Sequence, residues 1–402
     1  MCFIIAFSTL GFSSEKPREV QPKKICLNMI VKNEKDVIER CLASVKPLID
    51  YWVIVDTGSH DGTQDIIKKC MSDIPGELYE RPWVDFATNR NEALSLAKTK
   101  ADYIFFIDAD EILEFSSDFS SQALCDDCYY ITVRQEGVVD FLRMGLVKSQ
   151  LDWKWEGVLH EMIYSPQIKT SSVLKGVLNV CNSGQLGARS KDVDYIQKYL
   201  RDAKILEEAL KKEPTNSRYM YYLGQSYLSA QNYPLAINAF KKRTQMQSKD
   251  IQETYIALYH TAVAYEQSGD VDSAIESYFK AFEFNSKRAE PLMHSAVLYR
   301  QKGNIFLGYL LSKYALSLSP PKMDICVEYK CYDYETLVEF ANCALLLGKF
   351  DEGLDACSRL LANPNLPAEM RDKVLANADL ARRNLNCAQT PKMIAAPCGE
   401  SS

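Results

Sequence analysis

Apolar runs alternate with helical patterns through the first part of this 402-residue chain. Ile25–Val31, Trp52–Val55 and Tyr103–Ile107 are short, rich in β-branched or aromatic residues, and typical of buried strands. The residues between them, including 36–45 and 89–99, carry apolar side chains at helical spacing. Repeated strand–helix units form parallel sheets with right-handed crossovers. The alternation therefore predicts a Rossmann-like α/β domain with a mostly parallel sheet.

Polar residues follow three of these strands, at Asn33, Asp56 and Asp108. The carboxyl ends of parallel strands meet at one sheet edge, and open α/β sheets bind their ligands there. Asp108 and Asp110 place two carboxylates one residue apart at this edge. Oxygen ligands suit Mg²⁺ or Mn²⁺, which usually bind together with substrate phosphates. Taken alone, the acidic tripeptide is equally well explained as a solvated turn.

Several common nucleotide and hydrolase motifs are absent from the chain. No strand is followed by Gly-x-Gly-x-x-Gly or by a P-loop, and no Ser lies in a Gly-x-Ser-x-Gly setting. His160-Glu161 lacks the second histidine of a zinc protease, because Tyr164 occupies that position. A diphosphate bound without a glycine-rich loop needs a metal, which favours the metal interpretation of Asp108 and Asp110. The net charge of −6 gives no basis for a nucleic-acid partner.

The cysteines and the N-terminus bear on the cellular location. Thirteen scattered cysteines form no regular disulfide pattern, so we expect reduced thiols. Residues 1–12 are apolar but lack a basic start and are too short to span a bilayer. We expect a cytoplasmic protein, or a membrane-associated or secreted one if residues 1–24 comprise a weak signal or anchor and a linker.

Four segments in the predicted order carry a resemblance to a known family. They are Asn28–Glu34, Val55–Thr63, Trp83–Asn91 and Phe106–Glu111. Residues 25 to about 165 resemble a family 2 glycosyltransferase with the GT-A fold. The resemblance implies a nucleotide-sugar donor, a UDP-sugar above all, with Mn²⁺ or Mg²⁺ as cofactor and inversion at the transferred sugar. UDP-glucose and UDP-N-acetylglucosamine are the leading donors by family alone.

The resemblance assigns roles to the donor side of the site. It implies that Glu34 and Asp56 contact the nucleoside, where acidic side chains accept hydrogen bonds from hydroxyls and the base edge. Arg90 is predicted to fork onto phosphate or sugar oxygens. Asp110 is the expected direct metal ligand, and Asp108 acts through a water or the ribose. The structural alternatives are a turn cap for Asp56, a helix-start charge for Glu34 and a surface charge for Arg90.

His160 lies in Trp153–Glu161, which is similar to a Trp-x-x-x-x-Val-His-Glu stretch in a branch of this family. The resemblance makes His160 the third metal ligand, and a satisfied core histidine is the alternative. Glu161 is the predicted general base that takes the acceptor proton. Glu156 and Asp152 are rivals for that role.

From about Tyr195 the chain is nearly all helical in pattern. Small residues and aromatics recur at a spacing close to the tetratricopeptide period, in three clear units and one degenerate unit. Residues 322–333 are predicted to be an insertion before the last unit. We expect a glycosyltransferase domain at 25–190, a helical-repeat domain at 195–388 and a disordered tail at 389–402.

Two classes of function remain open. The first is a metal-dependent inverting hexosyltransferase that acts on a protein, peptide or glycan acceptor, lipopolysaccharide included. Its repeats would bind the acceptor or form a homodimer. The second is a non-catalytic tetratricopeptide adaptor with a degenerate nucleotide-sugar-binding domain. The acid pair, Arg90 and His160 favour the enzyme.

Overall fold

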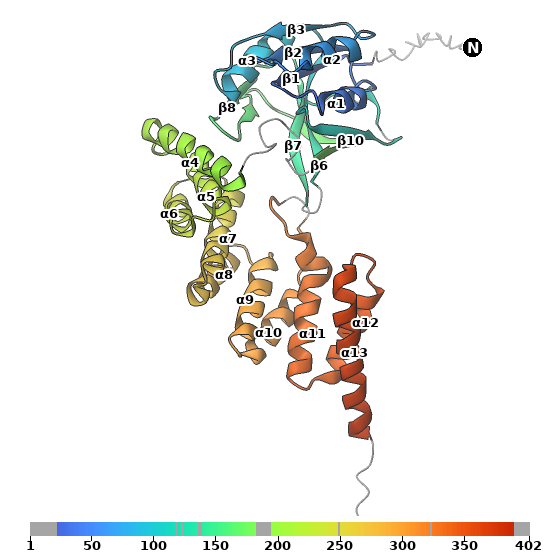
Figure 1. The fold of residues 1–402 in the computed structure, drawn as a ribbon, viewed down its shortest axis with the longest axis vertical. Helices are drawn as coiled ribbons and strands as arrows, with labels where there is room; N and C mark the ends of the chain where they lie inside the picture. The colour runs from blue at the N-terminus through green and yellow to red at the C-terminus, as the bar shows by residue number, and fades with distance from the viewer. Residues whose placement is uncertain are drawn as a thin grey trace, which may run out of the picture.

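A sheet domain and an array of helices follow one another in the computed structural model (Figure 1). The order α/β sheet and then helical solenoid confirms the predicted fold class. The structure describes residues 22–117, 119–121, 124–135, 139–181, 194–247, 250–321 and 324–389. The predicted signal or anchor, and residues 390–402 of the predicted tail, lie outside these ranges. The last strand ends at Cys181 and the first repeat helix begins at Tyr195.

The strands of the alternating region form one half of an eight-stranded sheet. They are β1 (Ile25–Val31), β2 (Tyr51–Asp56), β3 (Gly76–Glu80) and β4 (Tyr103–Phe106). They pair in parallel in the order β3-β2-β1-β4, so their carboxyl ends share an edge. The crossovers are α1 (Ile38–Val45), α2 (Thr63–Cys70) and α3 (Phe86–Ala97).

Four further strands continue the sheet beyond β4 in the order β7-β6-β10-β5. They are β5 (Glu111–Phe115), β6 (Cys128–Gln135), β7 (Val139–Lys148) and β10 (Ser171–Cys181). β7 is antiparallel to both β4 and β6, and β10 is parallel to β6. A separate hairpin joins β8 (Lys154–Glu156) to β9 (Met162–Tyr164). This hairpin brackets the loop that carries His160 and Glu161.

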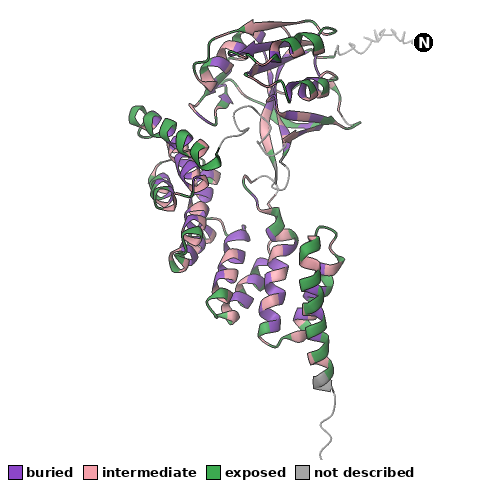
Figure 2. Cartoon of the chain, viewed as in Figure 1, coloured by how far each residue is buried: buried purple, intermediate pink, exposed green. Residues whose placement is uncertain are grey.

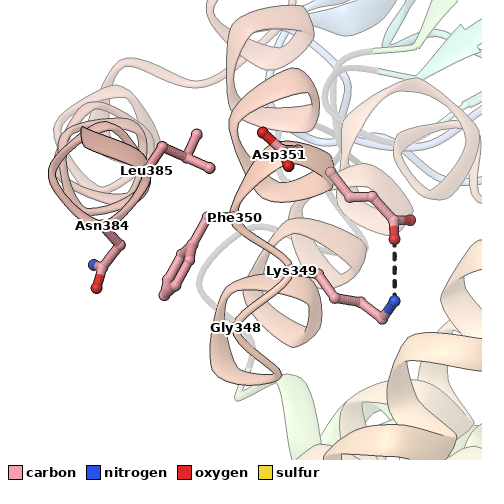
Figure 3. A pocket seen from close by; sticks show the side chains of 7 residues that line it. Gly348, Lys349, Phe350, Asp351, Asn384 and Leu385 are labelled. Atoms are coloured by element: carbon pink, nitrogen blue, oxygen red, sulfur yellow. Dashed lines mark hydrogen bonds and ion pairs between the residues drawn. The ribbon is translucent and has the colours of Figure 1, made fainter. Parts of the chain in front are cut away.

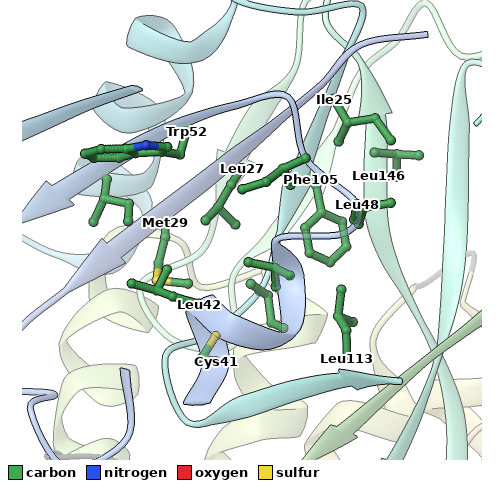
Figure 4. Packing of buried hydrophobic residues seen from close by; sticks show 14 of the residues in the cluster. Ile25, Leu27, Met29, Cys41, Leu42, Leu48, Trp52, Phe105, Leu113 and Leu146 are labelled. Atoms are coloured by element: carbon green, nitrogen blue, oxygen red, sulfur yellow. The ribbon is translucent and has the colours of Figure 1, made fainter. Parts of the chain in front are cut away.

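The core of the sheet domain explains why β1 is apolar on both faces. Leu27 and Met29 pack toward α1, where Cys41 and Leu42 are fully buried (Figure 4). Cys26 belongs to a second cluster, which also contains side chains of α3. Figure 2 shows the same buried centre in the sheet and a buried stripe along most helices. A central strand covered on both faces has no polar alternation.

Ten α-helices and one π-helical turn make up the described part of the repeat array. They are α4 (Tyr195–Lys212), α5 (Ser217–Ser229), α6 (Tyr233–Gln245), α7 (Ile251–Ser268), α8 (Val271–Phe284), α9 (Glu290–Gln301), α10 (Ile305–Ala315), η2 (Cys331–Glu335), α11 (Thr336–Leu346), α12 (Phe350–Ala362) and α13 (Ala368–Gln389). Asn or Asp side chains cap several of these helices, as Asn216 does for α5. Gly224 lets α5 approach α6, because a Cβ there would lie 2.6 Å from the Phe240 ring.

Two surface features of the array complete the description. A shallow pocket lies between the start of α12 and the end of α13, lined by Phe350 and Leu385 among others (Figure 3). It contains none of the predicted site residues. None of the helices in the described ranges is long and apolar enough to cross a membrane.

Candidate active site

Asp56 ends β2 and is completely buried at the shared sheet edge. Its Oδ1 accepts hydrogen bonds from the backbone N–H groups of Gly58 and Ser59, at 2.8 and 2.7 Å. Its Oδ2 is also buried and has no hydrogen-bond partner among the residues that the structure describes. Buried polar atoms are nearly always paired in folded proteins. This oxygen is therefore an acceptor without a donor in the described part of the chain, and a bound ligand could supply one.

Glu34 lies in the loop after β1, beside the loop that follows Asp56. The Glu34 backbone N–H donates to Thr63 Oγ1 at 2.8 Å, and Ser59 Oγ accepts from the Asn33 N–H at 2.8 Å. Asn33 has a left-handed backbone, with φ of 57°. These bonds join the two loops, so Glu34 and Asp56 are presented by one rigid edge.

Arg90 joins two acids that are far apart in the sequence. Its Nη2 donates to Asp108 Oδ1 at 2.7 Å, and its Nε donates to Glu161 Oε1 at 2.6 Å. Its guanidinium also lies over the ring of Trp155, 5.0 Å from the centroid. One forked cation thus holds the acid after β4 and the predicted general base together.

Glu111 was not predicted as a site residue, yet it organises the floor of the acid cluster. It is 2% exposed, and its two carboxylate oxygens accept hydrogen bonds from the Nη1 and Nη2 groups of Arg143, at 2.8 and 2.5 Å. Asn179 of β10 and the Asp108 backbone N–H also donate to it. Arg143 therefore forms a structural ion pair with Glu111. Its place directly after Asp110 was the signal for Glu111.

Asp108 and Asp110 differ in their electrostatic surroundings. Burial would raise the pKa of Asp108, but the charges of Arg90 and Arg143 outweigh it and lower that pKa. Burial, and then the charges of Asp108 and Glu111, raise the pKa of Asp110. The Asp110 carboxylate makes no ion pair with another residue of the described ranges. Its backbone carbonyl accepts a hydrogen bond from Arg40 Nη2 at 2.8 Å, a contact that no sequence pattern indicated.

The ring of His160 contacts the helical repeats. Its backbone is left-handed, with φ of 51°, and its ring stacks on Tyr222 of α5 with 4.1 Å between centroids. Within the described ranges, no three His, Cys, Asp or Glu side chains lie close enough to hold a metal ion. The structure therefore brings Asp108, Arg90 and Glu161 together, and it places the His160 ring against the helical repeats.

The two rivals for the general base face other partners. Asp152 forms an ion pair with Lys98 at 2.7 Å, and its side chain is 72% exposed. Glu156 pairs with Lys154 at 3.1 Å, also at the surface. Of the three acids, only Glu161 contacts Arg90.

The first repeats pack directly on the loop before Glu161. Leu159 is buried in the same cluster as Leu206 of α4 and Tyr221 of α5. Arg218 of α5 donates to the His160 carbonyl at 3.0 Å and to Glu253 of α7 at 2.8 Å. These contacts depend on how the two parts pack, so nothing in the local sequence marks Arg218 or Tyr222.

Comparisons with known proteins agree with both parts of this architecture. Residues 26–120 match the family model described as glycosyl transferase family 2, and residues 200–250 match a tetratricopeptide repeat model. A TPR repeat-containing protein of Synechococcus elongatus is 26% identical over 74% of this chain and 76% of its own length. The SPbeta prophage-derived glycosyltransferase SunS of Bacillus subtilis is 28% identical over 54% of this chain and 52% of its own.

Two further similarities are more limited in extent. An uncharacterized glycosyltransferase of Rickettsia bellii is 33% identical over 29% of this chain and 35% of its own length. Among solved structures, MamA aligns with 48% of this chain and 93% of its own, at a TM-score of 0.32 and 14% identity. The alignments with the named glycosyltransferases thus span about half of SunS and about a third of the Rickettsia protein.

Proposed function

We propose that this chain, which carries a family 2 glycosyltransferase domain followed by tetratricopeptide repeats, is a metal-dependent inverting glycosyltransferase. It moves a sugar from a nucleotide-sugar, a UDP-sugar in our proposal, to a polypeptide or glycan acceptor. The observation that carries the proposal is the bridge made by Arg90 between Asp108 and Glu161. It joins the acid at the ligand-binding sheet edge to a carboxylate on the side of the helical repeats.

The nucleoside is assigned to the edge formed by Glu34 and Asp56. The unpartnered buried Oδ2 of Asp56 supports this assignment, because a base N–H or a ribose hydroxyl would donate to it. A phosphate would be repelled there. The diphosphate is therefore assigned to the neighbouring strand end, near Asp108 and Asp110.

The donor set at Asp108 and Asp110 fits a divalent cation. Asp108 and Asp110 supply two carboxylates one residue apart, and burial, together with the charges of Asp108 and Glu111, raises the pKa of Asp110. Asp110 would hold the cation directly, with Asp108 acting through a water or the ribose. When bound, Mn²⁺ or Mg²⁺ would neutralise the diphosphate and stabilise the charge of the leaving group. His160 would join this set only if its ring left Tyr222.

Glu161 acts as the general base in this proposal. Its carboxylate lies 2.6 Å from Arg90 Nε, and a carboxylate can accept the proton of the acceptor nucleophile. Arg90 positions that carboxylate relative to Asp108 and, in turn, relative to the donor. Attack from the side opposite the diphosphate would invert the anomeric centre. The repeats lie against the Glu161 loop, so the acceptor is assigned to their side.

A non-catalytic adaptor remains the alternative function. A panel of UDP-, GDP- and dTDP-sugars, read out by thermal shift with and without Mn²⁺, separates donors from non-ligands. We expect the largest metal-dependent shift with UDP-glucose or UDP-N-acetylglucosamine. Stabilisation by a UDP-sugar without any release of UDP would favour the adaptor, and no shift with any nucleotide would overturn the assignment of the sheet edge.

A further inference from the structure

One connection in the helical array is far longer than the others. Residues 316–328 join α10 to the helical turn that begins at Tyr329 and continues into η2 and α11, whereas the other helices of the array are joined by two to five residues. Connections longer than about 12 residues are uncommon, and they are usually either functional or linkers. The sequence already indicated an insertion here. Its end, residues 324–328, lies against the repeats.

Residues 324–328 contact three alternate helices of the array. The Ile325 N–H donates to Gln252 Oε1 of α7 at 2.8 Å. Ile325 packs against the cluster that contains α5 and α7 side chains, and the thiol of Cys326 lies against Tyr221 of α5. Glu328 reaches His294 of α9. The segment thus runs over α5, α7 and α9.

Arg288 donates hydrogen bonds to the backbone of this segment. It is 1% exposed, and it donates to the carbonyls of Ile325 and Cys326 at 3.3 and 2.8 Å. Glu290 fixes its guanidinium through an ion pair of 2.7 Å, and the ring of Tyr255 lies 4.6 Å below it. Contacts to main-chain carbonyls do not depend on the side chains of the bound segment. Another peptide could accept the same hydrogen bonds.

Glu328 supplies the contact that depends on a side chain. The Tyr259 hydroxyl donates to its Oε1 at 2.6 Å, and His294 Nε2 lies 3.3 Å from its Oε2. Tyr259 is buried in α7, and His294 of α9 is partly buried. The surface therefore selects an apolar residue at one position and a glutamate three positions later.

The bound segment is also strained. Cys326 has φ of 51°, and among the described non-glycine residues only Asn33, His160 and Gln231 share such a backbone. A left-handed backbone at a non-glycine residue raises the free energy of the bound segment, and a peptide without this strain would bind more tightly. The segment is thus held by good contacts in a conformation that weakens its own binding.

We propose that the surface formed by Gln252, Arg288, Tyr259 and His294 is a binding site for an extended acidic peptide, and that residues 324–328 fill it as an internal substitute. The site adjoins Tyr221 and Tyr222, and Tyr222 stacks on His160 beside the proposed base. Resting on the proposed function, this identifies the peptide as part of a polypeptide acceptor, which displaces residues 324–328 when it binds.

The peptide site can be tested without any transfer assay. In one variant, residues 324–328 are replaced by a Gly-Ser sequence of equal length within the full chain. The probe is a fluorescent synthetic peptide with the sequence of residues 324–329, with Ser in place of Cys326. We expect the replaced variant to bind it at least about tenfold more tightly than the wild type, because the internal segment competes at a high effective concentration.

Two matched comparisons make the test specific. A probe with Gln in place of Glu328 should bind the replaced variant about tenfold more weakly than the original probe does. The original probe should lose about as much affinity when the replaced variant also carries Tyr259→Phe. Each change removes a charge-assisted hydrogen bond. Equal binding of both probes, or no binding to a folded replaced variant, would overturn the proposal.

A second variant covers the case in which the replaced chain does not fold. Glu328→Gln in the full chain keeps the Arg288 contacts and weakens only the internal segment, so it should bind the original probe more tightly than the wild type does. Identical probe affinities for the two chains would overturn the proposal. UDP-sugar binding, measured on the same samples, reports separately on the proposed function.

Discussion

The ring of His160 stacks on the ring of Tyr222, with 4.1 Å between centroids and 12° between planes. This contact joins the loop before the proposed base to the first tetratricopeptide repeat. Arg218 strengthens the junction, because it bonds the His160 carbonyl and lies over the Tyr222 ring at 4.8 Å. The position of Glu161 therefore depends on the repeats as well as on the sheet.

Tyr222→Ala should reduce transfer, in a protein whose unchanged donor affinity shows that the sheet domain is folded. Loss of an aromatic pair costs about 1 kcal/mol, so we expect kcat/KM to fall about fivefold while donor affinity is unchanged. Tyr314→Ala is the matched control, because Tyr314 is exposed on α10, away from the sheet. If both variants keep wild-type kcat/KM, the stacked pair does not position Glu161.

Arg90→Lys should be far more damaging than its conserved charge suggests. A lysine ammonium cannot reproduce the fork that holds Asp108 and Glu161, so we expect kcat to fall about 100-fold, or about 2.7 kcal/mol. Arg81→Lys, in a surface pair with Glu92, provides the control. A wild-type kcat in folded Arg90→Lys would show that the bridge is only structural.

Asp56→Asn should weaken nucleotide binding without unfolding the protein. The amide oxygen can still accept from Gly58 and Ser59, but an NH₂ group replaces the unpartnered acceptor. We expect the Kd for UDP, measured by calorimetry, to rise about 10- to 100-fold. Asp65→Asn, an exposed position on α2, should leave this Kd unchanged. Equal Kd values for all three proteins would remove Asp56 from the nucleoside site.

The helical repeats should lose stability at alkaline pH. Burial lowers the pKa of His294, but the hydrogen bonds that its ring donates to Glu266 and Glu328 outweigh burial and raise the pKa to about 10. A folded-state pKa above the unfolded value contributes stability that is complete below about pH 6.5 and is lost as pH rises toward 10.

Urea unfolding at several pH values between 6 and 10 measures this effect. The midpoint should fall with pH in the wild type, and His294→Gln should flatten the dependence. A parallel fall in both proteins would assign the effect to other groups.

The sequence predicted the half of the sheet whose strands are continuous apolar runs. The predicted bounds of Ile25–Val31 are those of β1, because a strand buried on both faces has an unambiguous pattern. The later strands, β5 to β10, were not assigned. Their half-exposed residues give a weaker signal, and β6 and β7 contain an irregular register.

The candidate site also contains residues that the sequence predicts and contacts that it does not. Asp56 and Asp108 follow strands directly, so their place at the sheet edge could be predicted from position alone. The contacts of Arg40, Arg218 and Tyr222 arise where helices pack on loops that are distant in the sequence. The spacing of residues in the sequence does not predict that packing. The ring of His160 turns toward Tyr222 through a left-handed residue, which local propensity does not favour.

Release of UDP from UDP-glucose and UDP-N-acetylglucosamine tests the central claim most directly. Wild type and Asp110→Asn are compared in Mn²⁺ and after chelation by EDTA, with equal thermal unfolding temperatures required of both proteins. We predict Mn²⁺-dependent release by the wild type, and at least about 100-fold slower release by Asp110→Asn, because a metal supplies several kcal/mol of stabilisation to the leaving group. Release by Asp110→Asn at the wild-type rate, in Mn²⁺, would contradict the account.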